Sequence, residues 1–95
     1  MTNVRFNFEY DPRKAKRNLR KHGISFDEAI TVFYDPLAAT LPDESHSADE
    51  HRFITIGQSA QRRVLFVVHA ERPAGIRLIS ARRATATEKK QYEEE

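Results

Sequence analysis

Hydrophobic and polar residues alternate without interruption near the start of the chain, over residues 4–10. Alternation with a period of two predicts a half-buried β-strand. After an Asp-Pro pair, residues 13–22 are helix formers, and the run stops at Gly23. A proline in the first turn and a glycine after the last residue are typical of a helix. Its apolar stripe is thin, so we expect the helix to dock along the edge that holds Ala15 and Leu19.

A second helix is predicted to begin after Ser25 and to end at Asp35, which precedes a proline. Ser25 and Glu28 have the spacing of a capping box, in which the hydroxyl accepts a backbone N–H and the carboxylate returns to the cap. Apolar residues recur with the spacing of one helix face, at Phe26, Ala29, Ile30 and Phe33. This stripe predicts a helix that packs on a sheet.

The remaining pattern is that of several strands and one short helix. Strands are predicted over residues 37–41, 52–58, 62–70 and 76–82, and a helix follows the capping box that starts at Thr85. The third of these strands is apolar on both faces, which is typical of a central strand. The predicted order is β-α-α-β-β-β-β-α. We therefore expect an α+β sandwich of two layers, with a mainly antiparallel sheet and helices packed on one face.

Composition limits the possible chemistry. A chain of 95 residues predicts a single domain, 1–95. It contains no cysteine, which excludes disulfides, thiolate metal sites and a thiol nucleophile. The longest apolar runs are far shorter than the roughly 20 residues that span a membrane, and the first residues lack an apolar signal core. We therefore expect a cytoplasmic protein with no membrane partner.

Charge is segregated along the chain, although the formal net charge is only +2. Residues 1–26 and 51–87 carry net charges of +5 and +6, whereas residues 27–50 and 88–95 carry −7 and −2. Clustered lysines and arginines favour binding to a polyanion, because they release its counterions. A solvated surface with salt bridges explains the pattern equally well.

One acidic loop contains His46, Asp49, Glu50 and His51. The spacing of these residues matches no metal-binding signature, and no cysteine is present to complete a site. We interpret the loop as solvated and predict neither a metal nor a cofactor.

A second polar group is spread over the predicted meander: Glu50, Arg52, His69, Arg77 and Arg82. Strand ends joined by a tight turn lie side by side, so His69 and Arg77 are expected as neighbours whose side chains can share a face. Histidine transfers protons near neutral pH, and arginines stabilise charge on phosphate. A histidine and several arginines are the side chains that metal-free RNA cleavage requires, in which the ribose 2′-hydroxyl attacks the adjacent phosphate. Spacing alone favours the alternative, in which His69 is an ordinary sheet residue and the arginines pair with acidic residues.

The first helix forms a cationic rod. Its basic residues cover most of the helix circumference: Arg13, Lys14, Lys16, Arg17, Arg20, Lys21 and His22. Contact with phosphates is the natural use of such a helix, and an acidic partner protein would fit it as well.

Short segments from about residue 6 to residue 92 share the pattern of one known family. They are residues 8–12 with Lys14 and Asn18, residues 21–26 with Glu28 and Ala29, residues 35–36, residues 50–53 with Gly57, and residues 76–84 with Glu88 and Tyr92. In these segments the chain resembles the BrnT toxins. The combination of the Lys-His-Gly-Ile-Ser-Phe segment with the later Ile-Ser-Ala-Arg segment is specific, whereas either one alone is weak.

The resemblance implies a RelE-like fold, ribonuclease activity that arrests translation, and neutralisation by a BrnA-type antitoxin in a dimer of heterodimers. It also implies that operator DNA is bound only through the antitoxin. By motif match, Glu50, Arg52, Arg77 and Arg82 are the family positions carried over as catalytic, and we add His69 as a candidate for proton transfer. The predicted RNA contacts are Tyr10, Lys14, Arg17, Lys21, His22 and Arg63. Tyr10 stands where relatives are expected to carry tryptophan, so it should stack on a base more weakly.

The sequence thus predicts the toxin of a type II toxin–antitoxin pair, a metal-free endoribonuclease that acts on RNA, free or ribosome-bound. Two alternatives stay open. One is a binding module that contacts nucleic acid or the ribosome without cleaving it, and the other is a degenerate toxin that acts only as a partner protein.

Overall fold

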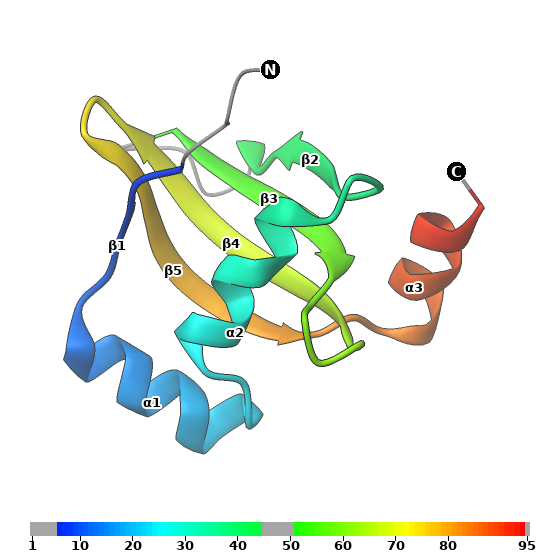
Figure 1. Ribbon diagram of the computed structural model, residues 1–95, viewed down its shortest axis with the longest axis horizontal. Helices are drawn as coiled ribbons and strands as arrows, with labels where there is room; N and C mark the ends of the chain where they lie inside the picture. The colour runs from blue at the N-terminus through cyan, green and yellow to red at the C-terminus, as the bar shows by residue number, and fades with distance from the viewer. Residues whose placement is uncertain (1–5, 45–50, 95) are drawn as a thin grey trace.

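The computed structural model describes residues 6–44 and 51–94, which form a five-stranded sheet and three α-helices (Figure 1). In chain order the elements are β1 (Phe8–Glu9), α1 (Pro12–His22), α2 (Phe26–Thr31), the 3-10 turn η1 (Val32–Tyr34), β2 (Ala39–Pro42), β3 (Arg52–Gln58), β4 (Val64–Arg72), β5 (Gly75–Arg83) and α3 (Ala86–Glu93). The strands lie in the order β1-β5-β4-β3-β2, and all neighbours are antiparallel except β1 and β5. The predicted mixed α+β class is confirmed.

The first strand is shorter than predicted. β1 pairs with β5 only through Phe8 and Glu9, because the chain turns at Asp11 to begin α1. Asp11 accepts the Arg13 backbone N–H at 2.8 Å. The helix ends at Gly23, whose φ of 71° is left-handed and suits a residue without a side chain. Residues 4 and 5 of the predicted strand lie outside the described residues.

The capping box predicted at the start of α2 is only half formed. Ser25 Oγ accepts the Glu28 N–H at 3.0 Å, as expected. The Glu28 side chain does not return to the cap, because it binds Ser59 and Arg63 instead. The second capping box, between Thr85 and Glu88 at the start of α3, is complete.

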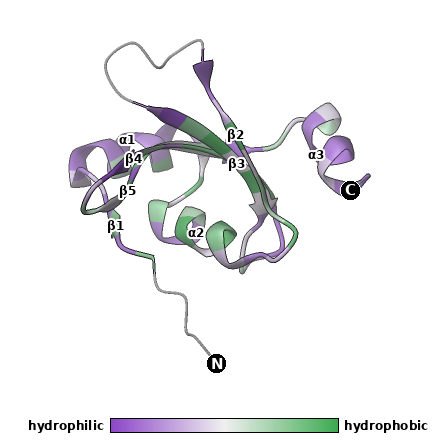
Figure 2. Ribbon diagram, turned by 90° about the horizontal axis from the view of Figure 1, so that it is seen from above, coloured by the Kyte–Doolittle hydropathy of each residue, from purple (hydrophilic) through white to green (hydrophobic). Residues whose placement is uncertain are grey.

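The core lies on one face of the sheet, where α2 packs (Figure 2). Its central side chains come from α2 and the residues around it and from the inward positions of β4 and β5: Ile24, Phe26, Ala29, Val32, Leu65, Val67, Leu78 and Ala81. α1 contacts β5 at the sheet edge, and α3 lies past the end of the sheet (Figure 1). No described helix is laid across the opposite face, which we call the open face.

α1 docks through a residue that hydrophobic periodicity does not identify. Asn18 is buried and Ala15 packs against the core, whereas Leu19 is 51% exposed, so the predicted docking edge is confirmed at Ala15 and wrong at Leu19. The Asn18 amide accepts the Ala81 N–H at 3.0 Å and donates to the Ala81 carbonyl at 2.8 Å. It also donates to the Ile24 carbonyl. Asn18 therefore continues the sheet where β1 has already ended, by pairing with the free edge of β5.

The segment after η1 lies tightly against β3 at Gly57. A Cβ atom at Gly57 would lie 2.8 Å from Ala38 Cβ and 2.9 Å from Val32 Cγ1, so only glycine fits there. Asp35 fixes this approach, because its carboxylate accepts the Gln58 N–H and the Tyr92 hydroxyl. The second of these bonds ties α3 to the segment after η1. None of the described helices is long and apolar enough to span a membrane.

Candidate nucleic-acid interface

A bulge in β5 decides which arginines share the open face. His69 pairs with Leu78 and Val68 pairs with Ser80, so Ile79 is an extra residue in β5. Arg77 and Arg82 are five positions apart and would otherwise point to opposite faces. The extra residue returns both side chains to the open face.

The arginines of the open face belong to two rows that cross the sheet. Arg52, Ala70 and Arg77 are paired across β3, β4 and β5 in one row. Ile56, Phe66 and Arg82 are paired in the other. The two rows are four residues apart along β3, or about 13 Å at the usual rise of a strand. The predicted arginines therefore divide into the pair Arg52 and Arg77 and the separate Arg82.

Arg52 and Arg77 lie on either side of β4, with Cα atoms about 10 Å apart, which is twice the usual strand spacing. Ala70, between them, has a small side chain and is fully buried. The Arg77 side chain is 44% exposed, and its Nε donates to Glu9 Oε1 at 3.2 Å. Glu9 is also 3.7 Å from Arg72, so one carboxylate serves two arginines. Positive charge therefore exceeds negative charge around Arg77.

Arg82 has a different environment. Its guanidinium carbon lies 3.9 Å from the centroid of the Phe66 ring, and two of its nitrogens bond the two Glu88 oxygens at 2.8 and 3.0 Å. The hydrogen bonds from Arg82 hold the pKa of Glu88 below its usual range. Arg82 thus joins β5 to α3, and a phosphate would compete with Glu88 for it.

His69 lies on the other side of the sheet. Its partner in β5 is Leu78, whereas Arg77 pairs with the next residue, Ala70, so the prediction that His69 and Arg77 share a face is wrong. The imidazole is 2% exposed and packs between the rings of Phe33 and Phe53. Burial lowers the pKa of His69 from 6.5 to about 4. A buried, neutral imidazole on this face cannot exchange protons with RNA bound to the open face.

Two predicted RNA contacts are engaged within the fold. Tyr10 packs edge-on against Phe26 with ring centroids 5.3 Å apart, and its hydroxyl donates to Asp27 at 3.1 Å. Arg63 binds Glu28 through two nitrogens, with Nε 2.9 Å from Oε2. The hydrogen bonds from Arg63 lower the pKa of Glu28, so this buried carboxylate stays charged. Both residues therefore stabilise the fold.

The cationic rod predicted from the sequence is present on α1. Lys14, Arg17 and Lys21 are exposed and His22 is half-buried. A shallow hollow of about 500 Å³ lies along the helix and is lined by Asp11, Arg13, Lys16, Arg17 and Arg20. These side chains are open to a polyanionic ligand.

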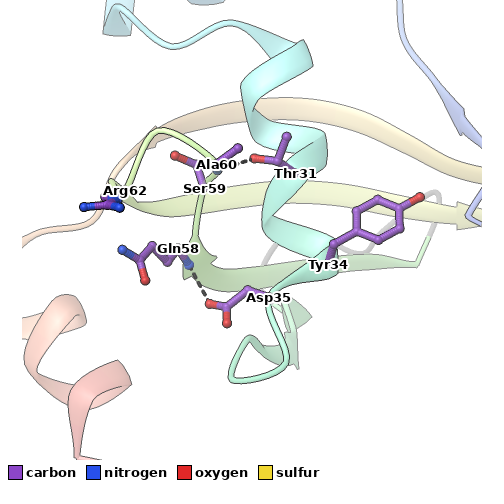
Figure 3. Close-up of a pocket in the computed structure, with 7 residues that line it drawn as sticks. All are labelled: Thr31, Tyr34, Asp35, Gln58, Ser59, Ala60 and Arg62. Atoms are coloured by element: carbon purple, nitrogen blue, oxygen red, sulfur yellow. Dashed lines mark hydrogen bonds between the residues drawn. The ribbon is translucent and has the colours of Figure 1, made fainter.

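Another hollow, of about 560 Å³, lies between α2 and the β3–β4 turn (Figure 3). Three of its polar side chains are hydrogen-bonded: Thr31 Oγ1 accepts the Ala60 N–H, Ser59 Oγ donates to Glu28, and Asp35 accepts the Gln58 N–H. Arg62 points away from these groups in Figure 3. The contacts of Thr31 and Ser59 fix the turn on the helix.

Glu50, the other candidate for proton transfer, lies outside the described residues, as do His46 and Asp49 of the acidic loop. Among the described residues, no group of three or more potential metal ligands is found. The sequence interpretation missed the carboxylates that decide which arginines are available, Glu9, Glu28 and Glu88. The spacing of Glu28 after Ser25 was a signal, but it also fits a capping box.

The fold and the interface together define a small α+β protein with an arginine-bearing open sheet face and a cationic helix, suited to a polyanionic ligand. The family model described as "Ribonuclease toxin, BrnT, of type II toxin-antitoxin system" matches residues 10–88. The chain therefore belongs to the BrnT family of ribonuclease toxins.

Among solved structures, the chain is similar to the 1.1 Å crystal structure of the Brucella abortus ribonuclease toxin BrnT. The TM-score is 0.62 at 24% identity, and the match covers 80% of this chain and 92% of the Brucella chain. This similarity supports the fold. A comparison with curated protein sequences gives no match.

Proposed function

We propose that the chain is a metal-independent endoribonuclease with a RelE-like fold, which arrests translation in the cytoplasm by cleaving RNA. Membership of the BrnT family supports the ribonuclease activity. The observation that carries the proposal is the row of Arg52, Ala70 and Arg77 on a sheet face that no described helix crosses. Two arginines on either side of a small residue can hold the phosphate of an RNA strand.

The reaction we propose is attack of a ribose 2′-hydroxyl on the adjacent phosphorus. The bond to the 5′ oxygen of the next nucleotide breaks, the 2′ proton passes to a base, and an acid protonates the leaving oxygen. Arg52 and Arg77 would bind the non-bridging oxygens and stabilise the negative charge that grows on them. Glu50, two positions before Arg52 in the sequence, stays a predicted proton-transfer residue. His69 takes no part in this step, because it is buried on the other face.

We also propose that a BrnA-type antitoxin neutralises the chain in a dimer of heterodimers, and that operator DNA is bound only through that partner. A type II toxin–antitoxin family implies an antitoxin. Exposed cations on α1 and around Arg77 would attract an acidic segment of such a partner.

Induced expression of the chain in bacteria tests the activity. We expect growth arrest with loss of messenger RNA, and normal growth of cells that express Arg77→Ala. Lys90→Gln is the matched control, because Lys90 is an exposed cation of α3, which lies past the end of the sheet (Figure 1). Normal growth of cells that express verified wild-type protein would contradict the proposal.

A non-catalytic RNA-binding module is the second candidate, and the burial of His69 favours it, because it removes a predicted proton-transfer residue. RNA binding that weakens with salt, without cleavage in the presence or absence of translating ribosomes, would select it. A degenerate toxin would bind its antitoxin but neither cleave RNA nor bind it.

A further inference from the structure

A second cationic site lies at the end of the sheet away from the β4–β5 hairpin. It is a hollow of about 380 Å³ between the β3–β4 turn, the end of β5 and α3. The side chains that matter are four cations, one carboxylate and one phenol: Arg62, Arg63, Arg83, Lys89, Glu93 and Tyr92. Cations therefore greatly outnumber carboxylates around this hollow.

Three of these cations form no ion pair, although the positive charge of Arg83 contributes to the lowered pKa of Glu28. Arg63 is bound to Glu28, but no ion pair joins Arg62, Arg83 or Lys89 to any carboxylate in the described part of the chain. All three are exposed. Like charges around one hollow repel each other, and an anionic ligand removes this repulsion.

The backbone around the hollow is held in place. Arg62 has a φ of 63°, in the left-handed region that residues with a side chain seldom adopt. The turn is closed by the bond from Arg62 N–H to the Ser59 carbonyl at 2.9 Å, and Ser59 Oγ is anchored to the buried Glu28 at 2.7 Å. Strained backbone fixed in this way is often found at ligand sites.

α3 is fixed on the opposite side of the hollow. The Tyr92 hydroxyl donates to Asp35, and burial together with this bond raises the pKa of Tyr92 to about 12. Tyr92 therefore stays protonated and acts as an anchor. Because α3 is tied down at Tyr92 and by the Arg82–Glu88 pair, Lys89 is presented to the hollow from a fixed helix.

We propose that Arg62, Arg83 and Lys89 form a phosphate-binding subsite for the RNA strand, distinct from the position of the phosphate that is cleaved. This inference rests on the proposed function. Arginine supplies forked donors and lysine a point charge, which together suit a phosphate group. Arg83 directly follows Arg82 and points to the other face, because it pairs with Leu65. A strand that leaves the open face past Arg82 therefore reaches the hollow at Arg83.

The test measures binding of a single-stranded RNA oligonucleotide with methylated 2′-hydroxyls, which cannot undergo attack by the 2′ oxygen. The binding constant of the purified chain is measured over a range of salt concentrations. For wild-type protein, the logarithm of the RNA-binding constant should fall linearly with the logarithm of the salt concentration. We expect Lys89→Gln and Arg83→Gln each to make this slope less steep by about 0.7, the value for one phosphate of a single strand. Lys90→Gln, on the next residue of α3, should leave the slope unchanged.

The outcomes separate this inference from the proposed function. If wild-type protein binds the oligonucleotide and cleaves unmodified RNA, but Lys89→Gln and Arg83→Gln bind with the wild-type slope, the subsite is refuted and the ribonuclease proposal stands. An equal loss in Lys90→Gln would also refute it, because it would show an unlocalised charge effect. Loss of slope in the two variants, with no cleavage by wild-type protein, would support the subsite and contradict the ribonuclease proposal.

A titration with inorganic phosphate provides a second test of the subsite. NMR shifts of the Arg83 and Lys89 side chains on titration with phosphate and with the methylated oligonucleotide identify the ligand source. Shifts with the oligonucleotide support the proposal. Shifts with inorganic phosphate but not with the oligonucleotide would overturn it, because the hollow would then bind a free anion and not an RNA strand.

Discussion

Arginine has opposite roles on the two sides of the sheet. On the helix side, Arg63 binds Glu28, whose side chain is 2% exposed, and the pair fixes the β3–β4 turn to α2. On the open face, Arg77 forms its ion pair with Glu9 in contact with solvent. Removal of one member of a buried pair leaves an uncompensated charge, whereas water screens an exposed pair. Burial of the partner carboxylate therefore distinguishes a structural arginine from one that is available to a ligand.

The largest effect should follow from breaking the helix-side pair. Arg63→Met leaves the Glu28 carboxylate buried without its cation, so we expect the free energy of unfolding to fall more than for any exposed ion pair of the chain. Urea denaturation measures the change. The double variant Glu28→Gln, Arg63→Met should recover much of the loss, because a neutral amide can still accept from Ser59. A loss under about 1 kcal/mol in Arg63→Met would show that this pair contributes no more to stability than an exposed salt bridge does.

The same contrast between the faces predicts a pH dependence that comes from His69. The unfolded chain binds a proton at this residue near pH 6.5, whereas the folded chain does so only near pH 4. The free energy of unfolding therefore has its full value, as far as His69 is concerned, above pH 6.5. It falls by about 3 kcal/mol in total as the pH drops from 6.5 to about 4. Urea denaturation at several pH values measures it.

His69→Gln is the control for this dependence, because it keeps a polar group near Thr55 but does not titrate. Its stability should change much less between pH 6.5 and pH 4 than that of the wild type. An equally steep fall in both proteins would assign the dependence to the carboxylates whose pKa values are lowered, such as Glu28 and Glu88.

The edge of the sheet gives a smaller effect. Asn18→Leu keeps the size of the side chain but leaves the Ala81 N–H and carbonyl without their partner, so we expect a loss of about 2 kcal/mol. Leu19→Ala, on the adjacent exposed residue, should cost about 0.5 kcal/mol or less. Equal losses in the two variants, measured by thermal or urea unfolding, would mean that the amide does not support β5.

These residues show which parts of the structure can be predicted from the sequence. Local patterns predicted β3 with its observed bounds and both ends of α1, because alternation and capping act between near neighbours. The role of Asn18 could not be predicted in this way, since its partner is 63 positions away. The extra residue Ile79 was also missed, and it is this residue that moves Arg77 to the open face.

The family pattern helped less with the site than with the fold. Asn18, Glu28, Asp35, Gly57 and Glu88 all belong to the segments that resemble the BrnT family, and each has a structural contact that explains it. A shared motif therefore marks the residues that hold the fold together as strongly as those that act on a substrate. Burial and partner carboxylates are needed to separate the two.

The smallest change in stability should accompany a large loss of function, at Arg77. Arg77→Gln removes an exposed ion pair with Glu9, so we expect the free energy of unfolding to change by about 0.5 kcal/mol or less. RNA cleavage and growth arrest should nevertheless be lost, because the open-face row then holds the phosphate through Arg52 alone. Urea denaturation and a cleavage assay on the same preparation measure both effects. If Arg77→Gln unfolds as readily as Arg63→Met, the arginines of the two sides do not differ as argued; if it stays stable and still cleaves RNA, the phosphate is held elsewhere.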